Sequence, residues 1–240
     1  GRHGRTELLW RQNHNEATMT PYSRENPSPR YRELLGYYQE MHEKGAVSQN
    51  IPPEKTFDGR SLPKHASNIQ QIINILGSRT ILDYGSGKGN QYNPTPIELP
   101  NGQKFDDIKS FWGVESITCF DPGHEPFSQL PKGTFEGVVT TDVLEHCPKE
   151  DISWIVDEIF SYATEFVYVN VACYPAAKTL PNGENAHCTL EEPDWWTKVF
   201  DERVRKTVGL RYFAAYDVPR MGAEGMSIMT VMHRNKWSAV

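Results

Sequence analysis

Along this chain, segments with apolar residues at helical spacing alternate with short apolar runs typical of strands. Residues 69–76 carry isoleucine and leucine at helical spacing, and Gly77 follows where a helix would end. Directly afterwards, residues 80–83 form a short apolar run that predicts a buried strand. Residues 31–41 show the same helical spacing nearer the N-terminus. The pattern therefore predicts a helix, a second helix and a strand in that order.

The same alternation continues through most of the chain. Apolar runs predict strands at residues 116–120, 137–141, 166–172, roughly 210–218 and 226–233. Pro148 is expected to open a helix whose core face is formed by Ile152, Ile155, Val156, Ile159 and Ala163. A further helix is expected to begin at Pro193, and a short one at about residues 106–112.

Strands that alternate with helices predict an α/β fold, with a doubly wound, mostly parallel, Rossmann-like sheet. The last two strands are expected to form an antiparallel pair at the C-terminus. Residues 1–64 are interpreted as an N-terminal arm and helical lid, of which 1–30 form a polar, irregular leader. Residues 65–240 are interpreted as the ligand-binding domain, and its strand ends are the expected place for a ligand.

Composition narrows the function classes. The chain has 240 residues and a formal net charge of −6, which makes a nucleic-acid partner unlikely by charge. No apolar stretch approaches the roughly 20 residues of a membrane span. The four cysteines form no C-x-x-C pair, so no metal site is expected and the thiols are expected to be reduced. With no secretory signal, a cytoplasmic protein is predicted.

A glycine-rich loop, LDYGSGKG at residues 82–89, follows the strand at 80–83. A triphosphate loop would need G-x-x-x-x-G-K-[S/T], which this segment lacks. A dinucleotide loop would need G-x-G-x-x-G opening a helix, yet the spacing here is G-x-G-x-G. Pro94, Pro96 and Pro100 then prevent a regular helix directly behind it.

S-adenosylmethionine is the third candidate ligand for this glycine-rich loop. It carries no phosphate, and glycines allow close approach to its methionine and ribose portions. It also requires a carboxylate at the end of the next strand, which accepts hydrogen bonds from the ribose hydroxyls. Asp121 occupies that position, and Asp83 is expected to face the ammonium group directly or through water.

Three motifs resemble those of class I S-adenosylmethionine-dependent methyltransferases. LDYGSGKG resembles their first motif, Cys119–Gly123 (CFDPG) is similar to their acidic second-strand end, and Thr141–His146 (TDVLEH) is similar to their D-V-L-E-H segment. The resemblance covers roughly residues 65–235. It implies a cofactor site at Asp83, Tyr84, Gly85, Ser86, Gly87, Gly89, Asp121, Pro122, Asp142, Val143 and Leu144.

The chain departs from that family between Asp121 and Asp142, where it has fewer residues than the family usually has. Little sequence separates Asp121 from Asp142, although the family usually fits a helix, a strand and another helix there. We therefore expect the edge strand to be lost, together with the acidic residue that usually holds the adenine. Phe127 is interpreted either as a cover for the adenine face or as a core phenylalanine.

Methyl transfer from a sulfonium needs chiefly alignment, with a base where the acceptor is a hydroxyl or a protonated amine. His146 and His187 are the candidate catalytic residues, with a structural histidine as the alternative interpretation of His146 and ordinary loop polarity as that of His187. No D/N-P-P-Y or Pro-Cys motif is present, which favours a small-molecule or sugar-type acceptor methylated on O or N. Two other functions remain open: an NAD(P)-dependent oxidoreductase and a non-catalytic binding module.

Overall fold

The computed structural model describes residues 22–222 and 225–235. Most of the predicted leader, residues 1–21, lies outside them. The α-helices are α1 (Pro29–Lys44), α2 (Ala66–Leu76), α3 (Ile108–Trp112), α4 (Ile152–Tyr162) and α5 (Pro193–Val204). The strands are β1 (Thr80–Tyr84), β2 (Ile97–Glu98), β3 (Lys104–Phe105), β4 (Ser116–Phe120), β5 (Phe135–Thr141), β6 (Ala163–Ala172), β7 (Arg211–Gly222) and β8 (Gly225–Arg234). Short 3₁₀ turns lie at Val47–Gln49, Pro53–Lys55, Leu62–His65, Asn90–Tyr92, Glu125–Phe127, Leu144–His146 and Lys149–Asp151.

Six strands form one sheet in the order β4-β1-β5-β6-β7-β8. All neighbours pair in parallel except β7 and β8, which pair antiparallel. The predicted mostly parallel, doubly wound sheet with a C-terminal antiparallel pair is therefore confirmed. The first five strands follow the 3-2-1-4-5-6 order of dinucleotide-binding sheets with the third strand left out. The chain between β4 and β5 forms only the 3₁₀ turn Glu125–Phe127, so β4 is the sheet edge, as expected.

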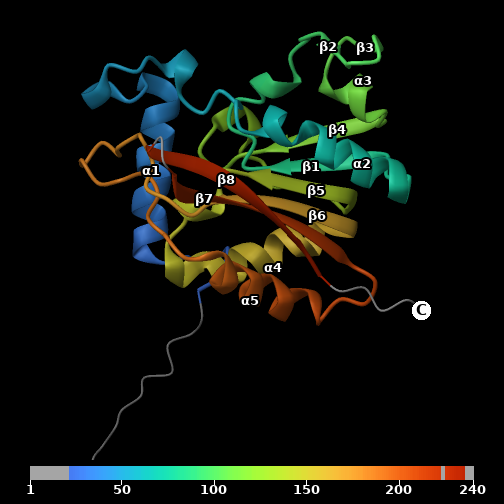
Figure 1. The fold of residues 1–240 in the computed structure, drawn as a ribbon. Helices are drawn as coiled ribbons and strands as arrows, with labels where there is room; N and C mark the ends of the chain where they lie inside the picture. Colours follow the sequence, from blue (N-terminus) through green and yellow to red (C-terminus); the bar gives the residue numbers. More distant parts are fainter. Residues whose placement is uncertain (1–21, 223–224, 236–240) are drawn as a thin grey trace, which may run out of the picture.

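Helices cover both faces of this sheet, with α2 and α3 on one face and α4 and α5 on the other (Figure 1). Successive strand residues point to opposite faces because the side-chain period of a strand is two. Val138 accordingly packs in the core with α4 and α5, while Val139 packs in the core with α2 and α3. Strands buried on both faces need an almost unbroken apolar run, which is why β5 and β6 were recognisable in the sequence.

Element boundaries agree with the sequence pattern except around α4. This helix begins at Ile152 rather than at Pro148, because Lys149–Asp151 first forms a 3₁₀ turn. Its last residue is Tyr162, and Ala163, expected on the helix, instead begins β6 as a buried strand residue. The chain thus passes from helix to strand with no loop between them.

The N-terminal segment is fastened to the main domain by a buried polar contact. The Asp151 carboxylate accepts hydrogen bonds from the Ser28 backbone N–H (3.0 Å), the Ser28 hydroxyl (2.5 Å) and the Trp154 indole N–H (2.7 Å). Ser28 also caps α1, since its hydroxyl oxygen accepts from the Tyr31 N–H at 2.9 Å. Ser28 and Asp151 are both fully buried, so α1 is held in place from its first turn.

We expect Asp151→Ala to lower the free energy of unfolding by about 3 kcal/mol, because it leaves buried donors of Ser28 and Trp154 without an acceptor. Urea denaturation followed by circular dichroism measures this. Asp157→Ala on helix α4, which begins directly after Asp151, is the matched control: the Asp157 side chain is 51% exposed and pairs with Arg203, so a loss below about 1 kcal/mol is expected. Equal losses in the two variants would contradict the anchoring role of Asp151.

Candidate functional site

A cavity of about 420 Å³ lies at the carboxyl ends of the central strands. From β1 the chain crosses to β4 on one side of it and then to β5 on the other, so β1 and β5 flank the point where the strand order reverses. The glycine loop and the residues after β4 and β5 form the floor of the cavity. Helix α1 and residues 57–65 cover the cavity, so the N-terminal segment completes the site. We call this segment, residues 22–65, the N-terminal cover.

The glycine loop needs glycine at two positions that face the cavity walls. Gly85 has a φ of +81°, and a side-chain Cβ there would come within 2.4 Å of the Val143 Cγ2. Gly87 has a φ of +57°, and its Cβ would lie 2.6 Å from the Phe57 carbonyl oxygen. Positive φ is rarely adopted by residues with side chains. The bare backbone therefore lets the loop pack against both the β5 end and the N-terminal cover.

Lys88 fastens the cover to the glycine loop. Its ammonium donates to the carbonyl oxygens of Pro53 (2.6 Å) and Thr56 (3.0 Å), and its backbone N–H donates to the Phe57 carbonyl at 3.2 Å. The Lys88 ammonium, a cation of the kind that binds phosphate, is thus engaged by the protein backbone.

Asp121, directly after β4, turns its carboxylate toward the glycine loop. One oxygen accepts from the Gly87 N–H and the other from the Gly123 N–H, each at 2.8 Å. Burial raises the pKa of Asp121 to about 6, although these backbone donors oppose the shift. Each carboxylate oxygen keeps a further lone pair for a ligand on the cavity side.

His42 of α1 lies beside Asp121, with 3.9 Å between its Nε2 and the carboxylate. Burial lowers the pKa of His42 to about 3, so the ring is neutral at pH 7. It packs between Phe57 and His124, with ring centroids 4.7 and 4.9 Å apart, and its Nδ1 is buried without a hydrogen-bond partner. Sequence reasoning missed this residue, because nothing local links α1 to the end of β4.

Three of the predicted cofactor residues do not line the cavity. Asp83 is buried behind the lining and accepts hydrogen bonds from Gln91 (2.8 Å) and the Tyr92 hydroxyl (2.9 Å), and burial raises its pKa to about 6. Gly89 packs against the Phe127 ring, and Leu144 is buried in the core. The remaining predicted residues line it: Tyr84, Gly85, Ser86, Gly87, Asp121, Pro122, Asp142, Val143, His146 and His187.

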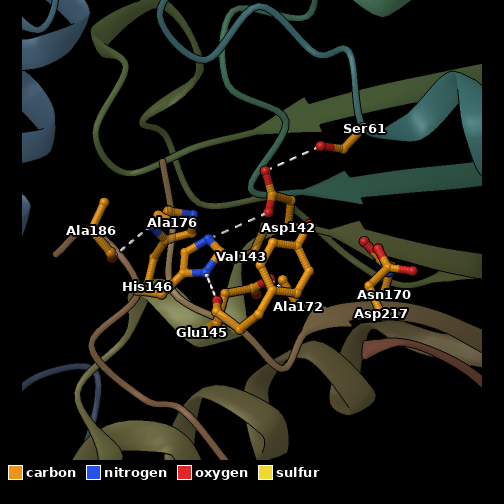
Figure 2. Close-up of polar contacts among 12 residues, drawn as sticks. Ser61, Asp142, Val143, Glu145, His146, Asn170, Ala172, Ala176, Ala186 and Asp217 are labelled. Atoms are coloured by element: carbon orange, nitrogen blue, oxygen red, sulfur yellow. Dashed lines mark hydrogen bonds and ion pairs between the residues drawn. The ribbon is translucent and has the colours of Figure 1, made fainter. Parts of the chain in front are cut away.

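The other end of the cavity brings Asp142, His146 and His187 together. One potential ligand atom from each lies within 4.8 Å of the others. Asp142 has a φ of 60°, an unusual conformation for a residue with a side chain, and this turns it into the cavity. Its carboxylate accepts from the Ser61 hydroxyl at 3.1 Å (Figure 2). The same carboxylate lies 3.8 Å from the His187 Nε2.

Both histidine rings are held by backbone carbonyls. The His146 Nδ1 lies 2.9 Å from the Ala186 carbonyl oxygen (Figure 2), and the His187 Nδ1 lies 2.6 Å from that of Tyr174. A carbonyl only accepts, so each Nδ1 carries the proton and each Nε2 keeps a lone pair. Burial lowers the pKa of His146 to about 4, which keeps its ring neutral at pH 7.

Glu145 joins the two segments that carry these histidines. Its backbone carbonyl accepts from the N–H groups of Cys188 (2.8 Å) and Thr189 (3.0 Å), and its carboxyl accepts from the Ala172 N–H at 2.6 Å. Complete burial raises the pKa of Glu145 well above its usual range. Because Glu145 precedes His146, these contacts place the His187 loop beside the β5 end.

Within the described residues, no helix is long and apolar enough to cross a membrane. No protein-family model matches the chain, and neither does any curated protein.

The contact between Gly85 and Val143 generates a stability test. Gly85→Ala should lose about 1–2 kcal/mol of unfolding free energy from its positive φ, and about 1–3 kcal/mol more from the clash with Val143. Gly77→Ala is the matched control, because Gly77 has a φ of +74° but open space around its Cβ. In a double-mutant cycle, Val143→Ala should relieve about 1 kcal/mol of the Gly85→Ala loss. Strictly additive losses would contradict the close packing of the two loops.

Proposed function

We propose that the protein is an S-adenosylmethionine-dependent methyltransferase that methylates O or N of a small-molecule or sugar-type acceptor. The observation that carries the proposal is the convergence of bare glycine backbone and the Asp121 carboxylate in one cavity at the switch point. This arrangement suits a ligand that has ribose hydroxyls and positive charge. The resemblance of the three sequence motifs to class I methyltransferases supports the same conclusion.

The electrostatics of the glycine loop disfavour a phosphate-bearing ligand. The Lys88 ammonium is already bonded to two carbonyl oxygens. The loop leads into the 3₁₀ turn Asn90–Tyr92 and the β2–β3 pair, and the next α-helix begins only at Ile108. A pyrophosphate would therefore find no helix N-terminus there, and it would face Asp121 instead. The sulfonium and ammonium groups of S-adenosylmethionine are attracted by the same carboxylate.

In the proposed complex the ribose lies against Asp121 and the methionine portion beside Gly85–Gly87. The adenine needs a different support from the usual one, because the edge strand is absent. Phe127 does not line the cavity and packs against Gly89. His42 and Phe57 do line the cavity, and His42 brings an unpartnered ring nitrogen beside Asp121. We assign the adenine contacts to these two residues.

The acceptor then lies at the opposite end, beside Asp142, His146 and His187. Methyl transfer requires an acceptor atom in line with the methyl group, and a rigid polar cluster supplies that alignment. The Nε2 lone pairs of the two histidines can accept a proton or a hydrogen bond from the acceptor.

An NAD(P)-dependent oxidoreductase is the second candidate, and the strand order favours it because dinucleotide-binding sheets share that order. An acidic residue after β4 also suits the ribose of NAD, so Asp121 does not separate the two candidates. The engaged Lys88 and the lack of a helix after the glycine loop argue against it. A non-catalytic binding module would use the same cavity without methyl transfer.

Isothermal titration calorimetry with S-adenosylhomocysteine and NADH tests the proposal. Micromolar binding of S-adenosylhomocysteine and none of NADH is expected, and the reverse result would refute the proposal. Asp121→Ala should weaken the binding about 10- to 100-fold, since the ribose hydroxyls lose a charged acceptor. Glu125→Ala, an exposed carboxylate in the following turn, is the matched control and should bind normally.

The raised pKa of Asp121 predicts a pH dependence. Below pH 6 its carboxyl is protonated in the free protein, so it loses charge and acceptor capacity. The affinity for S-adenosylhomocysteine should rise about tenfold per pH unit up to about pH 6 and stay level above it. Asp121→Asn should abolish this dependence, whereas Asp83→Asn should retain it, because Asp83 does not line the cavity. A profile unchanged in Asp121→Asn would assign the titration to another group.

A further inference from the structure

We infer that Asp142, His146 and His187 form a binding site for a divalent transition-metal ion. One ligand atom from each lies within 4.8 Å of the other two, and the Asp142 Oδ1 and His187 Nε2 are 3.8 Å apart. Ligands at about 2.0–2.1 Å from a tetrahedral metal lie about 3.4 Å from one another. Small side-chain movements would therefore bring all three atoms to bonding distance.

Every proposed ligand is already oriented by a second contact. The His146 Nδ1 faces the Ala186 carbonyl, the His187 Nδ1 faces the Tyr174 carbonyl, and the other Asp142 oxygen accepts from Ser61. Histidines that bind metals almost always donate their second ring N–H to a carbonyl or carboxylate, which directs the remaining lone pair at the ion. Contacts of this kind fix the two rings and the carboxylate independently of one another.

The backbone at Asp142 supports the same conclusion. Its φ of 60° costs free energy for a residue with a side chain, and such conformations concentrate at functional sites. The conformation brings the carboxylate to the histidines, while 43% of the Asp142 side chain stays exposed toward the cavity. His187 is only 7% exposed, so the site is walled on the protein side and open toward the cavity.

The ligand set selects the class of metal. Two imidazoles and one carboxylate with open positions suit zinc, iron(II), cobalt(II) or nickel(II), whereas magnesium and calcium prefer oxygen ligands alone. The open positions face the cavity end that the proposed acceptor would occupy. In the metal-loaded site the two Nε2 lone pairs are taken up by the ion and no longer act as bases. An oxygen atom of the acceptor could instead complete the coordination and be aligned with the methyl group, and this role alone rests on the proposed function.

Cobalt(II) titration of the metal-free full-length protein tests the site. We expect one ion per chain, seen by calorimetry and by a visible absorption band. Asp142→Asn and His187→Gln should abolish the band, and Ser61→Ala should weaken binding on the order of 10-fold, because it removes an outer contact. His233→Gln on β8 is the matched control and should bind normally, since His233 does not line the cavity.

X-ray absorption of the cobalt-loaded wild-type protein makes the test independent of the folding of any variant. Two imidazole nitrogens with oxygen ligands would support the site. Sulfur or all-oxygen coordination, no bound ion, or binding retained in both ligand variants would overturn it. Titration of S-adenosylhomocysteine on the same samples separates the two proposals: metal binding without nucleoside binding leaves the metal site standing, and the converse leaves only the proposed function.

Discussion

The close contact between Gly85 and Val143 is the constraint on which the rest of the site depends. It lets the loops after β1 and β5 touch at the switch point of the sheet, because no side chain separates them. Two consequences follow. The glycine backbone lies open beside Asp121, and the segment from Asp142 to His146 faces the same cavity. One glycine thus joins the Asp121 side of the cavity to its histidine side.

The N-terminal cover forms one side of the cavity at the strand ends. Three polar contacts hold the cover: Lys88 to the carbonyls of Pro53 and Thr56, Asp151 to Ser28, and a half-buried cluster around Arg24. Arg24 donates to Glu158 and Tyr84 and lies 4.9 Å from the Trp154 ring centroid. Cation–π and charged hydrogen bonds strengthen when water is excluded. These contacts tie the cover to the glycine loop, to β1 and to helix α4.

Burial also sets the charge state of the cavity. It raises the pKa of Asp121 to about 6 and lowers that of His42 to about 3 and that of His146 to about 4. His42 and His146 are therefore neutral at pH 7, while Asp121 titrates at about pH 6. The cavity therefore favours a cationic ligand group near Asp121. Near the end of β5 it favours a group that donates a proton or a hydrogen bond to the neutral His146 ring.

Sequence alone determined the sheet and the floor of the site. Hydrophobic periods of two and of about 3.6 are local, so they identified the main strands and helices before any contact was known. The lost edge strand was predicted from the short spacing between Asp121 and Asp142, compared with the methyltransferases that the motifs resemble. Strand-end positions of a parallel sheet converge, which placed Asp121 and Asp142 at one edge. Only the tertiary structure decided which side chains face the cavity. Asp83 turned toward Tyr92, His42 arrived from α1, and His187 arrived beside Asp142. These positions depend on side-chain contacts between separate elements of the chain, and such contacts leave no periodic signal in the sequence.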